Sequence, residues 1–574
     1  MVNALVNLDA VEQATKATRD WHRRMSRTKP LVRLWANPPD GEYDRGLILR
    51  GIVSDNQGGT FPFTKTDVAT GTLKLRLDHH LAQWLLSIPE DEEAKKNVVI
   101  TVDHMGSALR WSGLMKHWKA TRDAQGILHL EVTFADDRQM LDFLLGPPNP
   151  ALPIPLFQFP RVLPLFGPTK FIVSLLILMN IMRVQGNWWT LPDDPSDWES
   201  WADSGDMSTW QAFVRMDPLL QDSSLWTVLA TRMDIINTVI ADAMDDAQVV
   251  LRYRRILTVD GEDPADWGVQ NAVRNGALVF WVEDVSGFYA EEGTAFGGAL
   301  WKGFTRSIVN FFEGFVESFL VTVTDDQTIW PDAYYQPGFY SQRPSHPWII
   351  IRDSKWSQVE TSELGYNPAG PVSVIVGGDN PYADQLAELL IQSVGNILGY
   401  FALGGFSSAG DIAATVIMPF LVGTILAWLQ WKNFSRAQQL GWVHLWEMYG
   451  QGGEQNAWSL SAIVALRNAF EASSSKTTHK FTMTGDGPIY PGLHMLPGDR
   501  IGSTAEKIVR NKVFVDAVET MELSWDYSGV TPTAHAYAIQ VGTGVALMSI
   551  AERQARQLNK ALDLLQNIGV HIIS

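Results

Sequence analysis

The chain has 574 residues, a formal net charge of −18 and no cysteine. This strong negative charge argues against sequence-independent binding of nucleic acid, because such binding needs clustered lysine and arginine. The lack of cysteine excludes disulfides, cysteine nucleophiles and cysteine-ligated metal sites. Hydrophobic residues make up 46% of the chain, as in ordinary globular proteins, and the length favours several domains.

The N-terminal part of the chain combines a helical pattern with a β pattern. Apolar residues at helical spacing from Leu5 to Ala14 predict an N-terminal helix within residues 1–30, without the pattern of a secretory signal. Residues 31–146 contain short strand-like runs separated by proline and glycine turns, with a short helix at 78–87 and a closing helix at 136–145. We expect these strands to form a first small antiparallel β-barrel domain.

Residues 147–223 are a connector rich in proline and tryptophan. Eight prolines lie between Gly146 and Pro168, and proline at this density cannot propagate a helix or an interior strand, so we expect an extended connector. The apolar residues Phe171–Met182 follow. They are too few to cross a bilayer and predict a buried helix.

Residues 224–330 are expected to form an α+β domain. A helix is predicted over 225–244, followed by strands over 249–257 and 277–284. A later amphipathic helix carries a phenylalanine stripe at helical spacing, which is typical of a core or of packing against a partner helix. The stripe consists of Phe311, Phe312, Phe315 and Phe319.

The stretch from Leu389 to Trp431 is apolar, and its only charged residue is Asp411. Its last 20 residues, Ile412–Trp431, carry no charge, which is the length that a helix needs to cross a bilayer core. We expect residues 331–388 to be loop-rich with a strand. Residues 389–450 are predicted to be a hydrophobic helical hairpin followed by a polar helix over 434–449.

A second β pattern occupies residues 451–543, and a helix is predicted within 544–574. We expect the strands to form a second β-barrel domain. The predicted fold class is therefore α+β and multidomain. Two small antiparallel β-barrel domains are separated by α+β and hydrophobic helical insertions.

No catalytic, cofactor-binding or metal-binding residue is predicted. The G-x-S-x-G, H-E-x-x-H, Walker and Rossmann patterns are all absent. His79 and His80 are adjacent and point in different directions on a helix or a strand, so neither Asp78-His79-His80 nor Asp103-His104 predicts a metal site. Two groups of acidic residues are interpreted as solvated charge. The first is a loop group of Asp260, Glu262, Asp263 and Asp266. The second lies at the end of a predicted helix and consists of Asp242, Asp245 and Asp246.

Three stretches, taken in order, resemble the minor tail proteins of actinobacteriophages with long non-contractile tails. They are residues 30–87, residues 233–288 and residues 493–544. The first and third resemble the two barrels of the baseplate hub, or tail-associated, proteins of the ReqiPepy6-type siphovirus tail protein family. The second resembles the helix-then-strands unit of that family.

The resemblance implies a structural virion protein, not an enzyme. It would be a homotrimeric baseplate hub at the tail tip, made in the host cytoplasm, which closes the tail tube and links it to the adsorption apparatus. The implied partners are the distal tail protein, the tape measure protein and other minor tail or tip proteins, with no specific nucleic-acid binding. Two alternatives stay open: a tail-associated cell-wall hydrolase and an integral membrane channel protein.

The apolar stretch allows three interpretations. It is buried at the trimer axis, or it is stored there and released into the host membrane during DNA ejection, or it anchors an ordinary integral membrane protein. The glycine-rich centre of the stretch would permit a hairpin between two helices. The candidate positions for membrane insertion or trimer-axis packing are Leu389, Tyr400, Phe401, Phe406, Ile412, Val416, Phe420, Leu421, Ile425, Trp428 and Trp431.

Overall fold

The computed structural model describes most of the β-rich parts of the chain and several helices. The described residues are 8–39, 45–122, 126–154, 158, 162–186, 196, 201, 206–219, 222, 224, 226–285, 288–290, 322–324, 342–344, 349–352, 357–377, 428–450, 469–470, 472–473, 475–485, 487, 489–504, 508, 512–528 and 533–542. Three predicted features lie outside them. These are the phenylalanine stripe at Phe311, Phe312, Phe315 and Phe319, the apolar positions from Leu389 to Ile425, and the C-terminal helix.

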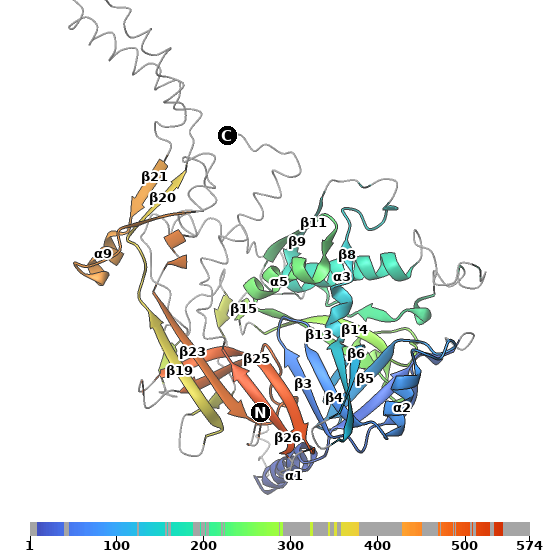
Figure 1. Ribbon diagram of the computed structural model, residues 1–574. Coiled ribbons are helices and arrows are strands. Elements are labelled where there is room, and N and C mark those ends of the chain that lie inside the picture. Colours follow the sequence, from blue (N-terminus) through green and yellow to red (C-terminus); the bar gives the residue numbers. More distant parts are fainter. Residues whose placement is uncertain are drawn as a thin grey trace, which may run out of the picture.

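A 14-stranded, mainly antiparallel sheet runs through the described part of the chain (Figure 1). Its main path has the order β19-β23-β26-β25-β3-β4-β7-β6-β5-β1-β2, and it does not close on itself among the described strands. The division into two barrels therefore stays a prediction. The N-terminal strands are β1 (Leu31–Ala36), β2 (Ile48–Ile52), β3 (Gly58–Thr64), β4 (Thr70–Arg76), β5 (Val98–His104), β6 (Leu109–Arg122) and β7 (Leu128–Asp136). The later strands are β16 (Thr322–Thr324), β18 (Ile350–Ile351), β19 (Val359–Asn367), β23 (Lys476–Thr484), β24 (Arg500–Thr504), β25 (Lys512–Asp526) and β26 (Thr533–Val541).

The two β regions that the sequence places at opposite ends of the chain are joined by direct strand pairing. Strand β3 pairs antiparallel with β25, from Gly58 opposite Asp526 to Thr64 opposite Thr520. Across this joint the Phe61 ring stacks on Trp525, with ring centroids 5.6 Å apart. One hydrophobic core contains buried side chains from both regions. The two regions thus form a single packed body.

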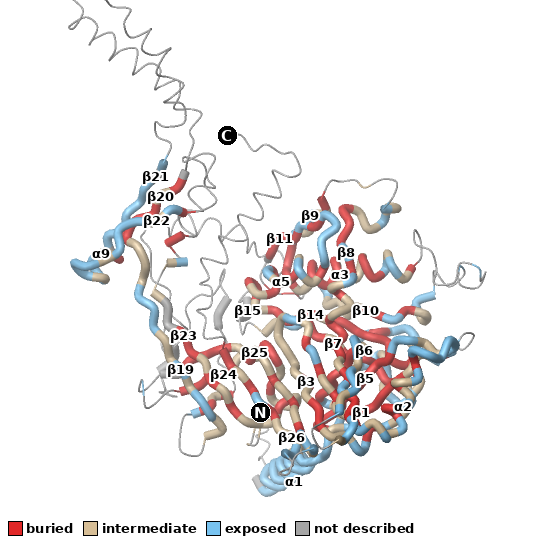
Figure 2. Tube along the Cα trace, in the orientation of Figure 1, coloured by how far each residue is buried: buried red, intermediate tan, exposed pale blue. Residues whose placement is uncertain are grey.

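Two helices flank this body. Helix α1 (Leu8–Ser26) lies within the predicted N-terminal helix, and its residues are mostly exposed (Figure 2). Helix α2 (His80–Ser87) begins after His79, whose Nδ1 accepts a hydrogen bond from the Leu81 N–H over 3.2 Å. The predicted closing helix at 136–145 is wrong beyond its first turn. A 3-10 helix, η2 (Asp137–Leu141), is followed by the short strand β8 (Leu145–Gly146).

A second body packs helices against a three-stranded sheet and has its own core. Helix α3 (Thr169–Gln185) confirms the buried helix predicted over Phe171–Met182, since Val173, Leu176 and Ile177 are fully buried. The remaining elements are β9 (Leu163–Pro168), β10 (Ala212–Val214), β11 (Trp226–Thr231), β12 (Asp234–Ile235), α5 (Ile236–Ala247), β13 (Val249–Ile256) and β14 (Ala277–Asp284).

Two predictions for this second body need correction. The helix predicted over 225–244 begins only at Ile236, because Trp226–Thr231 is strand β11. The proline connector is not wholly extended, since the Leu152 N–H donates to the Asn149 carbonyl in a turn, and its last residues form a paired strand, β9, which lies antiparallel to β11. Among the described residues the pair has no third strand, and proline, which lacks an N–H donor, is tolerated at such an edge.

A third, small sheet has the order β21-β20-β22 and lies apart from the other two bodies (Figure 1). It comprises β20 (Ser373–Gly377), β21 (Trp428–Lys432) and β22 (Glu447–Tyr449), with helix α9 (Phe434–Leu440) between the last two. The helix predicted to extend to Trp431 is therefore wrong at its end, because Trp428 and Trp431 lie in a strand. The polar helix predicted over 434–449 ends at Leu440, after which Gly441 adopts a positive φ of 85°.

A run that is apolar at almost every position has no helical or strand periodicity to read. The sequence therefore could not locate the point near Trp428 where β21 begins. The uncharged residues left for a helix, Ile412–Ala427, are fewer than the ~20 that a bilayer crossing needs. Within the described parts of the chain, every helix is too short or too polar to span a membrane.

Candidate interaction surface

Exposed large apolar side chains are concentrated on the small sheet, on helix α9 and on the segment between α9 and β22. Trp442 has 95% of its surface exposed and Trp446 has 80%. We call the whole set the aromatic surface, and its members are Trp428, Trp431, Phe434, Trp442, Val443, Leu445, Trp446 and Tyr449. Exposed apolar side chains gathered in one region of a protein are typical of sites of interaction.

The aromatic surface is built on a packed interior. In the central strand β20, Val374 and Val376 are completely buried. Asn433 caps helix α9, its Oδ1 accepting a hydrogen bond of 3.0 Å from the Arg436 N–H. Arg436 is also buried. Its guanidinium donates to the carbonyls of Pro371 and Phe470 over 3.1 and 2.8 Å and lies over the Phe470 ring.

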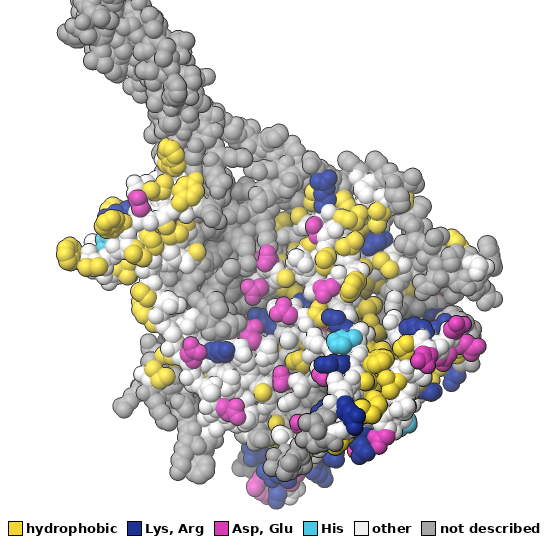
Figure 3. Space-filling model, viewed as in Figure 1, with side chains coloured by type: hydrophobic (Ala, Val, Ile, Leu, Met, Phe, Trp, Pro, Cys, Tyr) yellow, Lys and Arg dark blue, Asp and Glu magenta, His cyan; other side chains and the backbone are white. Residues whose placement is uncertain are grey.

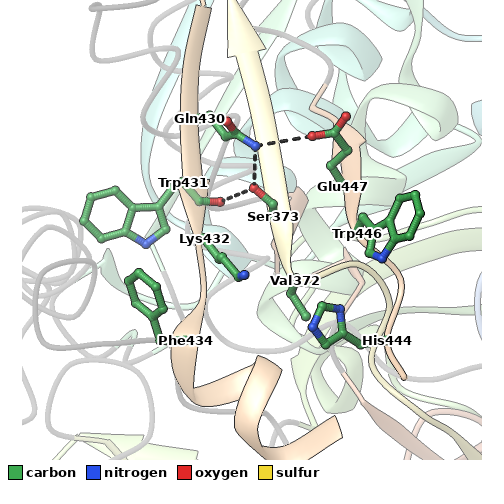
Figure 4. Close-up of a pocket in the computed structure, with 9 residues that line it drawn as sticks. All are labelled: Val372, Ser373, Gln430, Trp431, Lys432, Phe434, His444, Trp446 and Glu447. Carbon is green, nitrogen blue, oxygen red and sulfur yellow. Dashed lines mark hydrogen bonds between the residues drawn. The ribbon is translucent and has the colours of Figure 1, made fainter. Parts of the chain in front are cut away.

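A hollow of about 580 Å³ lies within this surface (Figure 4). Trp431 and Phe434 stand on one side of it, and His444 and Trp446 on the other. Gln430 crosses its floor, because its Nε2 donates to Ser373 Oγ over 3.1 Å and to Glu447 Oε2 over 3.3 Å. The hollow thus combines aromatic walls with a small polar floor, which suits binding by surface complementarity.

Sequence reasoning found only part of this surface. Trp428 and Trp431 were candidate positions, but as members of a helix. The other six residues fell inside the predicted polar helix. The available signal was four tryptophans within residues 428–446, a residue type that is enriched at interfaces.

Two of the four acidic residues interpreted as solvated loop charge, Asp260 and Glu262, belong instead to an ion-pair cluster between the first two bodies. Arg33 donates to Asp260 Oδ2 over 2.7 Å and to Asp103 Oδ2 over 2.6 Å. Arg110 donates to Asp103 as well and reaches Glu262 Oε2 at 2.9 Å. The cluster therefore ties β1, β5 and β6 to the loop that follows β13.

Glu262 accepts hydrogen bonds from two arginines of this cluster and from a backbone N–H. Its Oε1 accepts from Arg254 over 2.7 Å, and its Oε2 accepts from the Leu257 N–H over 2.9 Å. Burial alone would raise the pKa of Glu262, but the Leu257 N–H, Arg110 and Arg254 outweigh it, so the pKa lies below its ordinary value. Glu262 is thus held ionised between arginines.

The other residues of these acidic groups divide between surface and core. Asp263 and Asp266 are exposed as predicted, and so is Asp242 in the middle of α5. Asp246 is only 2% exposed, which corrects its prediction as surface charge.

The aspartate–histidine groups weighed for metal binding have other partners. Asp78 pairs with Arg76 at 2.7 Å, and Asp103 is held by Arg33 and Arg110. His104 is buried against Tyr537. Over the described parts of the chain, no three metal-ligating side chains of the His, Cys, Asp and Glu types come together.

One buried serine, histidine and aspartate lie close together in the C-terminal β region. The Nδ1 of His479 is 3.0 Å from Asp516 Oδ2, and Ser503 Oγ lies 3.3 Å from that same nitrogen. In a catalytic triad the serine and the carboxylate face opposite ring nitrogens, whereas here Ser503 Oγ is nearer to Nδ1, the nitrogen that faces Asp516, than to Nε2, which is 3.5 Å away. Ser503 is also only 1% exposed, so a substrate could not reach its hydroxyl in this conformation.

The sequence matches phage tail proteins over most of its length. It is 28% identical over 542 residues to the minor tail protein Gp28 of Mycobacterium phage D29, which covers 86% of this chain and 89% of that protein. The minor tail protein Gp28 of Mycobacterium phage L5 is also 28% identical, over 541 residues with the same coverage. The class is therefore that of siphovirus minor tail proteins. The chain belongs to the family of Siphovirus ReqiPepy6 Gp37-like proteins, whose family model matches residues 33–535.

Among solved structures, two tail proteins are similar to this chain over most of its length. The tail protein from Neisseria meningitidis MC58 has a TM-score of 0.36 and 8% identity, covering 91% of this chain and 99% of that chain. The 43 kDa tail protein of prophage MuSo2 from Shewanella oneidensis has a TM-score of 0.35 and 9% identity, covering 90% and 99%.

The family match confirms the resemblance predicted from the sequence. The chain is a structural component of a virion tail. The described structure is mostly β with few helices and more than one packed body, which confirms the α+β, multidomain fold class.

Proposed function

We propose that this chain is the homotrimeric hub at the tail tip, where it closes the tail tube and links it to the adsorption apparatus. The observation that carries the proposal is the pairing of β3 with β25. A connector that transmits load between tube and tip needs a rigid body. A continuous hydrogen-bonded sheet over one shared core supplies such a body from both ends of the chain.

In this proposal the strands of residues 31–146 and 451–543 are the two hub barrels of each subunit. Three subunits then place six such units around the tube. The bodies between residues 147 and 450 are insertions that project from the ring. The N-terminal helix and the C-terminal helix flank the two barrels.

The proposed partners are the distal tail protein above the ring, the tape measure protein inside it and other minor tail proteins below it. The aromatic surface supplies one contact area of the kind that such assembly needs, because aromatic residues are enriched at the cores of protein interfaces. DNA would pass through the ring without specific binding. The chain's strong negative charge would repel the phosphate backbone.

The proposed role is mechanical and not enzymatic. The curated relatives carry the name of minor tail proteins. The Ser503–His479–Asp516 group lacks triad geometry, as described above. Hydrolysis of cell-wall polymer would require an accessible catalytic set.

Light scattering of the full chain, purified without detergent, tests the oligomer. We expect a mass three times 64.0 kDa. Immunogold labelling of intact virions tests the position, and we expect label only at the tail tip. A monomer at all accessible concentrations, or label along the tube, would contradict the hub proposal.

A further inference from the structure

We propose that the aromatic surface docks onto a lipid bilayer at the depth of the headgroups. The inference rests on the proposed function, since a tail tip is the part of the virion that meets the host envelope. It adds the partner, a lipid surface, and the residues that meet it. The central residues are Trp428, Trp431, Phe434, Trp442, Trp446 and Tyr449, all of them exposed.

The side-chain types at this surface fit a bilayer interface. Four of its eight members are tryptophans and one is a tyrosine, and these two residue types concentrate where hydrocarbon meets water. In Figure 3 the hydrophobic side chains gather over β21 and α9, on the part of the molecule that projects from the main body. A projecting surface can reach a membrane without the main sheet having to approach it.

The charge of this region differs from that of the whole chain. Residues 428–450 contain two basic residues, Lys432 and the buried Arg436, and one acidic residue, Glu447, so their net charge is +1 and their exposed charges, on Lys432 and Glu447, cancel. The whole chain carries −18. Anionic headgroups would therefore repel most of the molecule but not this surface, so charge orients it toward the lipid.

The small sheet sets the depth of docking. Strands β21 and β22 are its two edges among the described strands, so one side of each strand lacks a strand partner there. Open sheet edges do not occur within hydrocarbon, where backbone N–H and C=O groups find no water. The sheet must therefore stay at headgroup level, where tryptophan rings insert and backbone groups remain hydrated.

The chain path connects this surface to the apolar stretch. Gly377 at the end of β20 lies opposite Trp428 at the start of β21, so residues 378–427 leave and rejoin the sheet at the same end. In sequence this segment contains four acidic residues, the last of them Asp411, and no lysine or arginine, and it ends with the uncharged run Ile412–Ala427. Along the chain, the apolar run is followed by tryptophans and then by Lys432. These residue types follow the same order from the core of a bilayer to its headgroups.

Vesicle flotation of the full chain tests the proposal. The vesicles contain phosphatidylcholine and phosphatidylglycerol at about 3:1, an anionic composition that retains most of the zwitterionic lipid. The variant is the double substitution Trp442→Ser with Trp446→Ser. Its matched control is Phe143→Ser with Val259→Ser, which removes two apolar side chains that are 86% and 64% exposed elsewhere.

We expect the wild-type chain and the control to float with the vesicles. The double tryptophan variant should bind at least about tenfold more weakly, because two large side chains lose their burial. Tryptophan emission of the wild-type chain should shift to the blue on vesicle addition. Absence of wild-type flotation, or equal binding by the tryptophan variant, would overturn the proposal.

Light scattering of the same proteins without vesicles separates this proposal from the hub proposal. A tryptophan variant that keeps the trimer mass but loses flotation supports lipid docking. A tryptophan variant that loses the trimer mass shows that the surface contacts a second copy, and the lipid proposal is then wrong. A wild-type monomer that still floats would contradict the trimer and leave lipid docking supported.

Discussion

The hydroxyl of Tyr537 lies 2.6 Å from Nδ1 of His104, although the two residues are 433 positions apart in the chain. The other ring nitrogen, Nε2, is 3.1 Å from the carbonyl oxygen of Thr28, which can only accept. Nε2 therefore carries the proton, and Nδ1 accepts from Tyr537. Burial and the neighbouring His535 lower the pKa of His104 to about 4, so this ring is neutral at physiological pH. The contact joins β5 to β26 and to the segment after α1.

Substitution of Tyr537 by phenylalanine tests this joint. The change leaves the buried Nδ1 of His104 without a donor, and an unsatisfied buried acceptor costs about 1–3 kcal/mol. We expect a lower guanidinium midpoint at unchanged slope. Tyr366→Phe is the matched control, since Tyr366 is exposed and should leave the midpoint unchanged. Equal midpoints for the two variants would show that the Tyr537 hydroxyl contributes nothing.

Asp136 should make stability depend on pH. Its Oδ2 accepts from the Tyr253 hydroxyl over 2.7 Å and from the Ala69 N–H over 2.9 Å, yet burial dominates and raises its pKa to about 7. The unfolded carboxyl, with an ordinary pKa near 3.8, loses its proton first as pH rises. The contribution of Asp136 is therefore fully present below about pH 4 and is lost as pH rises to about 7.

The Asp136→Asn variant isolates that contribution. Between pH 4 and 7 the unfolding free energy of the wild-type chain should fall relative to that of the variant, and above pH 7 their difference should be constant. The comparison uses the slope with pH, because loss of a carboxylate oxygen also shifts the absolute stability. The effect of His104 has the opposite sign but is common to both proteins. Parallel pH profiles would contradict the raised pKa.

Removal of the Glu262 charge should loosen the joint between the first β region and the α+β body. Glu262→Gln leaves Arg110 and Arg254 without their shared carboxylate, and breaking a buried pair in this way costs about 3 kcal/mol. Asp263→Asn is the control, because Asp263 is exposed and an asparagine there can still cap the following turn. Backbone amides of β13 and β1 should exchange hydrogen faster in Glu262→Gln than in the wild-type chain. Unchanged exchange in both variants would contradict the prediction that Glu262 holds this joint together.

Trp525 and Trp442 allow the same substitution at a buried and an exposed site. Trp525 packs against Phe61 across the β3–β25 pair and is 5% exposed, so Trp525→Ala should cost about 3–5 kcal/mol. Trp442 is 95% exposed, so Trp442→Ala should leave the unfolding free energy unchanged. Thermal unfolding followed by circular dichroism measures both. A destabilised Trp442→Ala chain would mean that this tryptophan is packed within the subunit.

Local sequence patterns determined several features of this protein. Apolar spacing located α1, the buried helix α3 and most of the strands, because each depends on residues only a few positions apart. The order of three stretches indicated the tail protein family, which the family model confirms. The concentration of tryptophan near residue 440 was visible too, but not its exposure.

Only the tertiary structure decided how these pieces meet. Strand β3 pairs with β25, and Arg33 forms an ion pair with Asp260. Both contacts join residues hundreds of positions apart, and no local periodicity encodes such partners. The uncharged run ending at Trp431 fits a helix and a buried strand equally well, and the pairing of β21 with β20 selected the strand. The exposure of Trp442 follows from what does not pack against it, so it is a property of the whole fold.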